Sequence, residues 1–233
     1  MTLSPIFAEL PDFSFDPTAV LVYGAGGHGK TLVELIKSMH IYHVVGVVDD
    51  HVPAQTLIAG VPVLGTADIL AECYQRGMRL AVNGVGGIGN VGVRLQVFEI
   101  LAKQHFTCPA IVHPSAWVED SAVLDAGVQV LAHAYVGSDA HVGFGSVLNV
   151  GVCFSHDVVV GKVTNFSPGA TLGGNVVVGD YTQVGMNASI NLGVKVGSRA
   201  RIGNGATVKA DVADESVVRA GAVFPPIKTT HTG

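Results

Sequence analysis

Residues 172–207 read LGGNVV-VGDYTQ-VGMNAS-INLGVK-VGSRAR-IGNGAT when they are divided into units of six. Every unit begins with Leu, Val or Ile, and its fifth residue is small or β-branched, as at Thr182 and Ala188. The pattern extends outward, because an aliphatic residue or Phe occupies each of the 17 positions at six-residue intervals from Val112 to Val208. Gly directly follows 8 of these 17 residues. This part of the chain is therefore one repeating structure.

A strict period of six fits neither the 3.6-residue period of an α-helix nor the simple alternation of a β-strand. It fits a short strand followed by a tight corner, in which one aliphatic side chain per unit points inward and stacks on the next coil. Glycine or asparagine suits such corners because these residues tolerate positive φ. The period predicts a parallel β-helix, and its unbroken register argues against an ordinary β-sandwich with chance spacing.

The N-terminal third has a different pattern. Residues 20–23, 44–48 and 79–82 are short apolar runs typical of buried strands. Residues 30–39 and 95–104 predict helices, the first with an apolar face. Strands that alternate with helices predict a small parallel sheet in an α/β domain. The expected parts of the chain are a lead-in (1–18), this Rossmann-like α/β domain (19–110), the β-helix (111–212) and a C-terminal tail (213–233).

Residues 24–29 read GAGGHG and directly follow the first predicted strand. The spacing G-x-G-x-x-G is that of a dinucleotide-binding loop, whereas GAGGHGKT is formally a Walker A loop. Both place backbone N–H groups and a helix N-terminus against a phosphate, so the loop indicates a nucleotide of unspecified identity. Asp49 and Asp50 lie near the offset of about 20 residues at which dinucleotide-binding domains carry an acid. The alternatives are a P-loop NTPase, for which the domain is short, and a glycine-rich turn that only packs strand on helix.

Composition argues against several classes of protein. A net charge of -5 with only 13 Lys and Arg residues does not suit a nucleic-acid-binding surface. The chain lacks the roughly 18 consecutive apolar residues of a transmembrane helix, and residues 1–18 lack the basic start and apolar core of a secretory signal. Cys73, Cys108 and Cys153 are odd in number and widely spaced, so they form neither a disulfide framework nor a zinc motif. We therefore expect a cytoplasmic protein without membrane insertion.

The combination of a glycine-loop α/β domain with a hexapeptide β-helix resembles the family of sialic-acid O-acetyltransferases and UDP-4-amino-sugar N-acetyltransferases, the sugar acyltransferases of bacterial glycan assembly. The resemblance covers about residues 20–212. The motifs that carry it are GAGGHGK (24–30), VDD (48–50), GVPVLG (60–65), HPSA (113–116), LN (148–149), SHD (155–157) and SPGATLGGNV (167–176). It implies a left-handed β-helix with three units per coil.

In this family the nucleotide-sugar lies on the N-terminal domain and acetyl-CoA lies along the β-helix. The resemblance therefore implies acetyl-CoA as co-substrate, no metal, and a homotrimer with active sites between neighbouring helices. The residues implied to bind the nucleotide-sugar are Gly26, Gly27, His28, Lys30, Asp49, Asp50 and Gly65. The residues implied to bind acetyl-CoA are Asn165, Gly173, Gly174, Met186 and Asn204.

His156 is the residue that the resemblance implies as general base. Acetyl transfer requires removal of a proton from the attacking amine or hydroxyl group, and imidazole suits this task at neutral pH. Asp157 is expected to raise the basicity of the ring and fix its tautomer. Asn149 is expected to orient the substrate or His156, with a purely structural corner role as the alternative. A backbone N–H at residues 173–174 is expected to stabilise the oxyanion.

The chain departs from the family pattern in two places. The family has a second histidine nine residues after the base, often in contact with acetyl-CoA, where this chain has Asn165. The family's Gly-x-Pro-Ala ending is replaced by AGAVFPP at residues 220–226, so we expect the adenine end of the CoA site to differ.

The favoured function is N-acetylation of a nucleotide-linked amino sugar, because the glycine loop together with Asp49 and Asp50 implies that the substrate carries a nucleotide. O-acetylation of a sialic-acid-type sugar and a non-catalytic nucleotide-binding scaffold are alternatives. A γ-type carbonic anhydrase needs three zinc-binding histidines, two of them in His-x4-His spacing, which His113, His133, His141 and His156 do not provide. Direct transfer needs no cysteine, so an acyl-enzyme on Cys153 is disfavoured.

Overall fold

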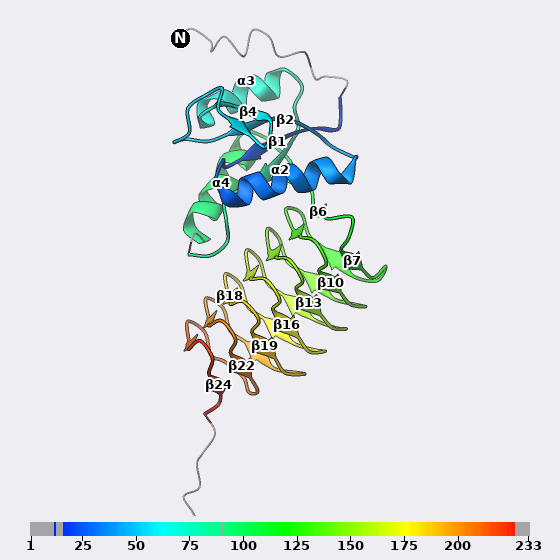
Figure 1. The fold of residues 1–233 in the computed structure, drawn as a ribbon, viewed down its shortest axis with the longest axis vertical. Helices are drawn as coiled ribbons and strands as arrows, with labels where there is room; N and C mark the ends of the chain where they lie inside the picture. The colour runs from blue at the N-terminus through cyan, green and yellow to red at the C-terminus, as the bar shows by residue number, and fades with distance from the viewer. Residues whose placement is uncertain (1–11, 13–15, 90, 227–233) are drawn as a thin grey trace, which may run out of the picture. The chain divides into compact units, whose positions relative to one another are not determined.

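The computed structural model describes residue 12, residues 16–89 and residues 91–226 of the 233-residue chain. The chain divides into two compact units between His113 and Pro114. The first unit is an α/β structure and the second is a stack of β-coils (Figure 1). None of the helices in the described part of the chain has the length and apolar character needed to span a bilayer.

The first unit is built on a five-stranded sheet with the order β3-β4-β2-β1-β5. Four of its strands are parallel, and the short β3 pairs antiparallel with β4 at the edge. The strands are β1 (Ala19–Tyr23), β2 (His43–Val48), β3 (Leu57–Ile58), β4 (Val61–Gly65) and β5 (Leu80–Asn83). All five residues of β1 are buried, as expected for a central strand covered on both faces.

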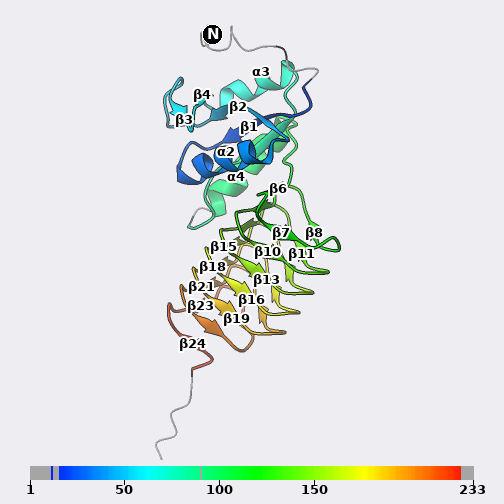
Figure 2. The same cartoon turned by 45° about the vertical axis from the view of Figure 1, so that its right-hand side comes forward.

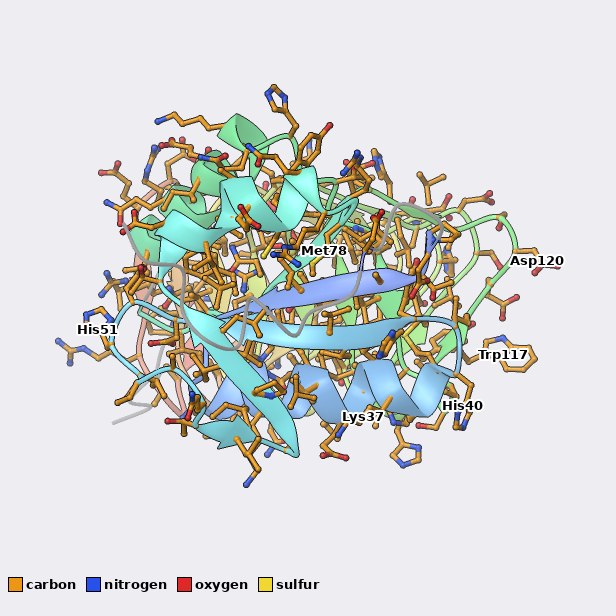
Figure 3. All side chains as sticks on the ribbon, turned by 90° about the horizontal axis from the view of Figure 1, so that it is seen from above. Lys37, His40, His51, Met78, Trp117 and Asp120 are labelled. Atoms are coloured by element: carbon orange, nitrogen blue, oxygen red, sulfur yellow. The ribbon has the colours of Figure 1, made fainter. Side chains whose placement is uncertain are left out.

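Helices cover both faces of this sheet. Figure 3 shows α2, which carries Lys37, on one face and α3 and α4 on the other. The apolar side of α2, formed by Leu32, Val33 and Ile36, is completely buried. The helical segments are α2 (Gly27–Met39), the 3-10 turn η1 (Ala67–Ile69), α3 (Leu70–Gln75) and α4 (Val91–Lys103).

The strands and helices predicted for this unit are present, with boundaries shifted by a few residues. The elements β3, β4, η1 and α3 were not expected from the sequence. The strand β3 has only two residues and α3 only six, so neither is long enough to produce a recognisable hydrophobic period.

The second unit is a left-handed parallel β-helix with three faces, and each strand contributes two residues (Figures 1 and 2). Face 1 contains β9 (Gln129–Val130), β12 (Val147–Leu148), β15 (Asn165–Phe166), β18 (Gln183–Val184), β21 (Arg201–Ile202) and β23 (Val217–Val218). Face 2 contains β7 (Trp117–Val118), β10 (Tyr135–Val136), β13 (Cys153–Phe154), β16 (Thr171–Leu172), β19 (Ser189–Ile190), β22 (Thr207–Val208) and β24 (Val223–Phe224). Face 3 contains β8 (Val123–Leu124), β11 (His141–Val142), β14 (Val159–Val160), β17 (Val177–Val178) and β20 (Lys195–Val196). A further strand, β6 (Ile111–Val112), precedes the boundary between the units.

The second residue of nearly every strand points into the β-helix, which explains the six-residue period. Phe154 and Phe166, for example, are fully buried and pack edge to face with their ring centroids 4.7 Å apart. Each strand pairs in parallel with the strand one coil away, so identical positions stack on one another. The predicted fold class is therefore confirmed.

The corner glycines have a different role from the one expected. Gly137 directly follows an inward residue but does not have a left-handed φ, and a Cβ there would lie 2.7 Å from the carbonyl carbon of Ser155. Positive φ instead occurs two residues later in the unit, with values of 67° at Gly151, 59° at Asp157 and 58° at Asn175. The attribution of the first set of glycines to positive φ is therefore wrong, because the close approach of the next coil is what requires them.

The coils also continue beyond residue 212, where the sequence analysis expected them to end. Val212 follows Val208 after four residues instead of six, yet it still forms a bridge with Val196. The six-residue interval then resumes at Val218 and Phe224, which extend faces 1 and 2. A search for inward residues at a constant interval of six misses these strands, because the interval between Val208 and Val212 is two residues shorter.

Candidate active site

His156 lies on the corner that joins face 2 to face 3, between β13 and β14. Its side chain is 56% exposed, and its Nδ1 atom lies 2.6 Å from Oδ2 of Asp157. When Nδ1 carries the proton, it donates this hydrogen bond to the carboxylate, which leaves the Nε2 lone pair available to accept another proton. His156 and Asp157 are therefore in contact through Nδ1, and the role of His156 as general base stays a prediction.

Asp157 reaches the imidazole because of its backbone conformation. Its φ of 59° lies in the left-handed region, which short polar residues tolerate better than most. The backbone N–H of Asp157 donates to the carbonyl of Ser138 on the preceding coil at 2.9 Å. The coil thus holds the residue in the conformation that presents the carboxylate to His156.

Gly174 lies directly beneath the imidazole, one coil further along. A Cβ built on Gly174 would lie 2.6 Å from both Cε1 and Nε2 of His156. The ring therefore occupies the space that any other side chain would fill. In the neighbouring residue Gly173, the backbone N–H already donates to Ile190 at 2.9 Å, whereas that of Gly174 has no hydrogen-bond acceptor among the described residues.

The other predicted residues of the β-helix lie elsewhere on the coil. Asn149, Met186 and Asn204 are on the corner between faces 1 and 2, and Asn165 is on face 1 itself. This corner is separated from His156 by a strand of face 2, a path of about six residues that spans at most ~20 Å. No hydrogen bond joins Asn149 to His156 among the described residues.

Several of these side chains already have local partners. Oδ1 of Asn149 accepts the N–H of Val150 at 3.1 Å, and Oδ1 of Asn204 accepts the N–H of Met186 at 2.9 Å. Asn165 is only 3% exposed, and its Nδ2 atom has no hydrogen-bond partner among the described residues. At the position where the resemblance implies a second histidine, the chain thus has a buried amide donor without an acceptor among the described residues.

The first unit holds the predicted phosphate site at the carboxyl end of β1. A Cβ on Gly29 would lie 1.8 Å from the carbonyl oxygen of Gly24, so these two glycines permit the tight strand-to-helix turn. A Cβ on Gly26 or Gly27 would meet no described atom within 4 Å. Packing thus accounts for the first pair of glycines, and the second pair faces open space at the N-terminus of α2.

The remaining predicted residues of this site lie at neighbouring strand ends. His28 is half-buried and Lys30 is exposed in the first turn of α2, while Gly65 ends β4. Asp50 accepts hydrogen bonds from the hydroxyl of Tyr23 at 2.7 Å and from the N–H of Ala67 at 2.9 Å. Burial and the Asp50 carboxylate raise the pKa of the Tyr23 hydroxyl, so Tyr23 remains a donor at neutral pH.

Asp49 is held by backbone groups. Its Oδ2 atom accepts the N–H of Ala25 at 2.7 Å, and its Oδ1 atom accepts the N–H groups of His51 and Val52 at 2.9 and 3.0 Å. Burial opposes ionisation of this carboxyl, but the three N–H donors outweigh it and lower the pKa of Asp49.

A second glycine-rich loop, residues 84–89 with the sequence GVGGIG, follows β5 and was not singled out from the sequence. A Cβ on Gly84 would lie 2.9 Å from the carbonyl oxygen of Gly24, so the two loops are in contact. The chain moves from β1 to β2 on one side and places β5 on the other, and ligands of parallel sheets bind at such a switch point. The glycine run is the signal in the sequence that identifies this loop.

Arg94 of α4 is hydrogen-bonded to the second loop. The side chain is 1% exposed and donates to the carbonyl of Val85, and burial lowers its pKa to about 10. Asn83 adds two contacts, since its Nδ2 donates to the carbonyl of Arg94 and its Oδ1 accepts the N–H of Val85.

The described residues contain no group of three or more His, Cys, Asp and Glu side chains arranged to hold a metal ion. Burial raises the pKa of the thiols of Cys73 and Cys108 to about 12 and about 11, so both are protonated at neutral pH. Cys153 is half-exposed on β13.

Comparisons with known proteins agree with this architecture. The family described as PglD N-terminal domain matches residues 19–101, and the six-repeat bacterial transferase hexapeptide family matches residues 175–210. The acetyltransferase domain of PglB from Neisseria gonorrhoeae, solved in complex with acetyl coenzyme A, is 30% identical with a TM-score of 0.81, over 89% of this chain and 98% of that chain.

Two structures from Caulobacter crescentus, both in complex with CoA and GDP-perosamine, are also similar. PerB is 27% identical with a TM-score of 0.80, and the match covers 87% of this chain and 94% of that chain. A histidine-to-asparagine mutant of perosamine N-acetyltransferase is 26% identical with a TM-score of 0.81 and has the same coverage. A hexapeptide β-helix preceded by a PglD-type α/β unit is the architecture of the sugar acyltransferases, and this chain belongs to that family. Within the family, it is an acetyltransferase.

Proposed function

We propose that the chain transfers the acetyl group of acetyl-CoA to the amino group of a nucleotide-linked sugar, of the UDP-4-amino type, with His156 as general base. The observation that carries this proposal is the contact of 2.6 Å between Nδ1 of His156 and the Asp157 carboxylate, with Nε2 above Gly174. The related structures with bound CoA and GDP-perosamine support the substrate class.

In the proposed reaction the lone pair of the sugar amine attacks the thioester carbonyl carbon, and a C–N bond forms. His156 accepts a proton from the amine through Nε2, while Asp157 stabilises the resulting imidazolium. The tetrahedral intermediate then collapses, the C–S bond breaks, and the proton on His156 passes to the departing CoA thiolate. This sequence balances charge and protons without a metal or an acyl-enzyme.

The N–H of Gly174 is the proposed oxyanion donor, because Gly173 already uses its own N–H within the coil. A preorganised backbone donor at the developing negative charge contributes to lowering the barrier. Gly174 thus has two proposed roles, since the absence of a side chain also gives room to the His156 ring.

The glycine loop of the first unit is proposed to bind the diphosphate of the substrate. Gly26 and Gly27 provide the open approach, His28 and Lys30 are proposed to contact phosphate or sugar, and Asp50 and Gly65 to border the nucleoside. Backbone N–H groups at a helix N-terminus suit a diphosphate because they carry the positive end of the helix dipole.

A homotrimer is part of the proposal. Asn149, Asn165, Met186 and Asn204 lie on another corner or face than His156, and a neighbouring copy is proposed to bring such residues to the His156 corner. A cyclic trimer satisfies this requirement with closed symmetry. The three free cysteines agree with the proposed cytoplasmic location, where thiols stay reduced.

The test is release of free CoA thiol from acetyl-CoA with a panel of UDP-, dTDP-, GDP- and CMP-linked sugars, each with and without a free amino group. We expect release with an amino sugar on one nucleotide and none with its hydroxyl counterpart. Release only with hydroxyl or sialic-acid-type sugars indicates O-acetylation instead. No release with any sugar, combined with nucleotide binding, supports the non-catalytic scaffold.

A further inference from the structure

Asp49 joins three segments of the first unit, two through its carboxylate and one through its backbone N–H. It accepts the N–H of Ala25 in the glycine loop and the N–H groups of His51 and Val52 in the turn after β2. The backbone N–H of Asp49 donates to the carbonyl of Gly65 at the end of β4, at 3.0 Å. Asp49 therefore connects the loop after β1 to the ends of β2 and β4.

These contacts leave the carboxylate little capacity for a ligand. A carboxylate has about four lone-pair sites, and backbone donors occupy three of them here. An acid that binds a ribose must instead accept from the ribose hydroxyl groups. The lowered pKa of Asp49 has the same origin, since the backbone donors stabilise the ionised form.

The bond to Ala25 acts on the phosphate site. The N–H of Gly24 donates to Val48 at 2.7 Å, so two consecutive N–H groups of the loop are directed toward β2. The following residues, Gly26 and Gly27, lead into α2, whose first N–H groups have no acceptor within the helix. Fixing the start of the loop thereby fixes the direction of the N–H groups that a diphosphate would meet.

We propose that Asp49 is a positioning residue, which holds the glycine loop in its phosphate-binding conformation and does not bind the nucleoside itself. This inference rests on the proposed function of the loop as a diphosphate site. It revises the role that the family resemblance implies for Asp49 and leaves Asp50 as the acid nearest to a nucleoside.

The test compares the full-length wild-type protein with Asp49→Asn, using inorganic pyrophosphate, UDP, GDP and the nucleosides uridine and guanosine as probes. In the variant the side-chain NH2 group replaces one carboxylate oxygen and cannot accept a hydrogen bond from a backbone N–H. The glycine loop or the turn after β2 therefore loses its hydrogen bond to this side chain. We expect binding of pyrophosphate and of the preferred nucleoside diphosphate to weaken about tenfold, with binding of the nucleoside unchanged. The KM for the nucleotide-sugar should rise in step, while the KM for acetyl-CoA stays the same.

Asp16→Asn is the matched control. Asp16 also accepts a backbone N–H, from Thr18 at 2.9 Å, and its pKa is also lowered, first by the hydroxyl of Thr18. Among the described residues, Asp16 makes no hydrogen bond or ion pair with the glycine loop, so its substitution should leave pyrophosphate binding unchanged. An equal loss of pyrophosphate affinity in both variants would indicate a general effect of removing a carboxylate and would overturn the proposal.

Two measurements on the ligand-free protein test the hydrogen bond between the Asp49 carboxylate and the N–H of Ala25. Amide hydrogen exchange at Ala25 should accelerate at least about tenfold in Asp49→Asn and stay unchanged in Asp16→Asn. In the wild-type protein, the NMR shift of the Ala25 amide should follow the titration of the Asp49 carboxyl, with a pKa below that of an ordinary aspartate. This second measurement needs no substituted protein.

The outcomes separate this inference from the proposed function. If the nucleoside loses as much affinity as the nucleoside diphosphate while pyrophosphate binding is unchanged, Asp49 contacts the nucleoside and the inference is overturned. If wild-type protein binds neither pyrophosphate nor any nucleoside diphosphate, the diphosphate site itself fails. An Ala25 amide whose exchange and titration do not depend on Asp49 overturns the positioning role alone.

Discussion

At the scale of single residues, the proposed base His156 is placed by Asp157 beside it and by a glycine, Gly174, beneath it. Asp157 accepts from Nδ1 at 2.6 Å, and Gly174 leaves the ring its space. The acid is next to the histidine in sequence and therefore visible there. The glycine is 18 residues away, one coil further on, and its relation to the ring follows only from the stacking of the coils.

We predict that Gly174→Ala lowers kcat by about 100-fold, near the lower end of what loss of a general base costs. The new Cβ would lie 2.6 Å from Cε1 and Nε2 of His156, so the ring must move off its position. Gly174 does not have a left-handed φ, so the backbone accepts alanine. Steady-state kinetics together with a thermal unfolding curve measure this.

Gly92→Ala serves as control for that substitution, since a Cβ at Gly92 meets no described atom within 4 Å. Its kcat should equal that of the wild type. A Gly174→Ala enzyme with normal kcat and normal stability would show that the ring does not need the position it occupies above Gly174.

At the scale of the elements, each six-residue unit carries two different backbone requirements. Glycines at the position directly after the inward residue lie close to the next coil, and in most units the position two residues after that one has a left-handed φ. Where glycine occupies the first position, as at Gly137 and Gly143, a Cβ would lie 2.7 Å from the backbone of the next coil. At the second position glycine is one option among several, because Asp157, Asn175 and Arg199 also adopt positive φ.

These requirements predict opposite effects for two substitutions. Gly143→Ala would place a Cβ 2.7 Å from the carbonyl carbon of Gly161, so it should destabilise the β-helix by about 1–3 kcal/mol, as overpacking does. Glu215→Gly relieves a left-handed φ of 59° at an exposed residue and should stabilise it by about 0.5–1 kcal/mol. Urea unfolding of the two variants measures both changes, and changes of the same sign would contradict the assignment of the two positions.

At the scale of the whole molecule, the β-helix was predictable because a large buried side chain recurs at the same position of each six-residue unit. The chain after Val208 was less predictable, since a two-residue slip conceals the last strands. The pair of His156 and Asp157 was visible in the sequence, whereas the placement of Asn149 on another corner was not. That placement depends on which of three faces each unit joins, which a linear motif does not report.

The proposed mechanism has His156 as the base for direct acetyl transfer and no role for Cys153. The most direct measurement is the rate of CoA-thiol release by wild type, His156→Ala and Cys153→Ala, with acetyl-CoA and the sugar that the wild type accepts. We predict that His156→Ala lowers kcat by about 100- to 10,000-fold, the range for loss of general-base catalysis, while Cys153→Ala keeps full activity. An active His156→Ala enzyme, or an inactive Cys153→Ala enzyme that is still folded, would contradict the account.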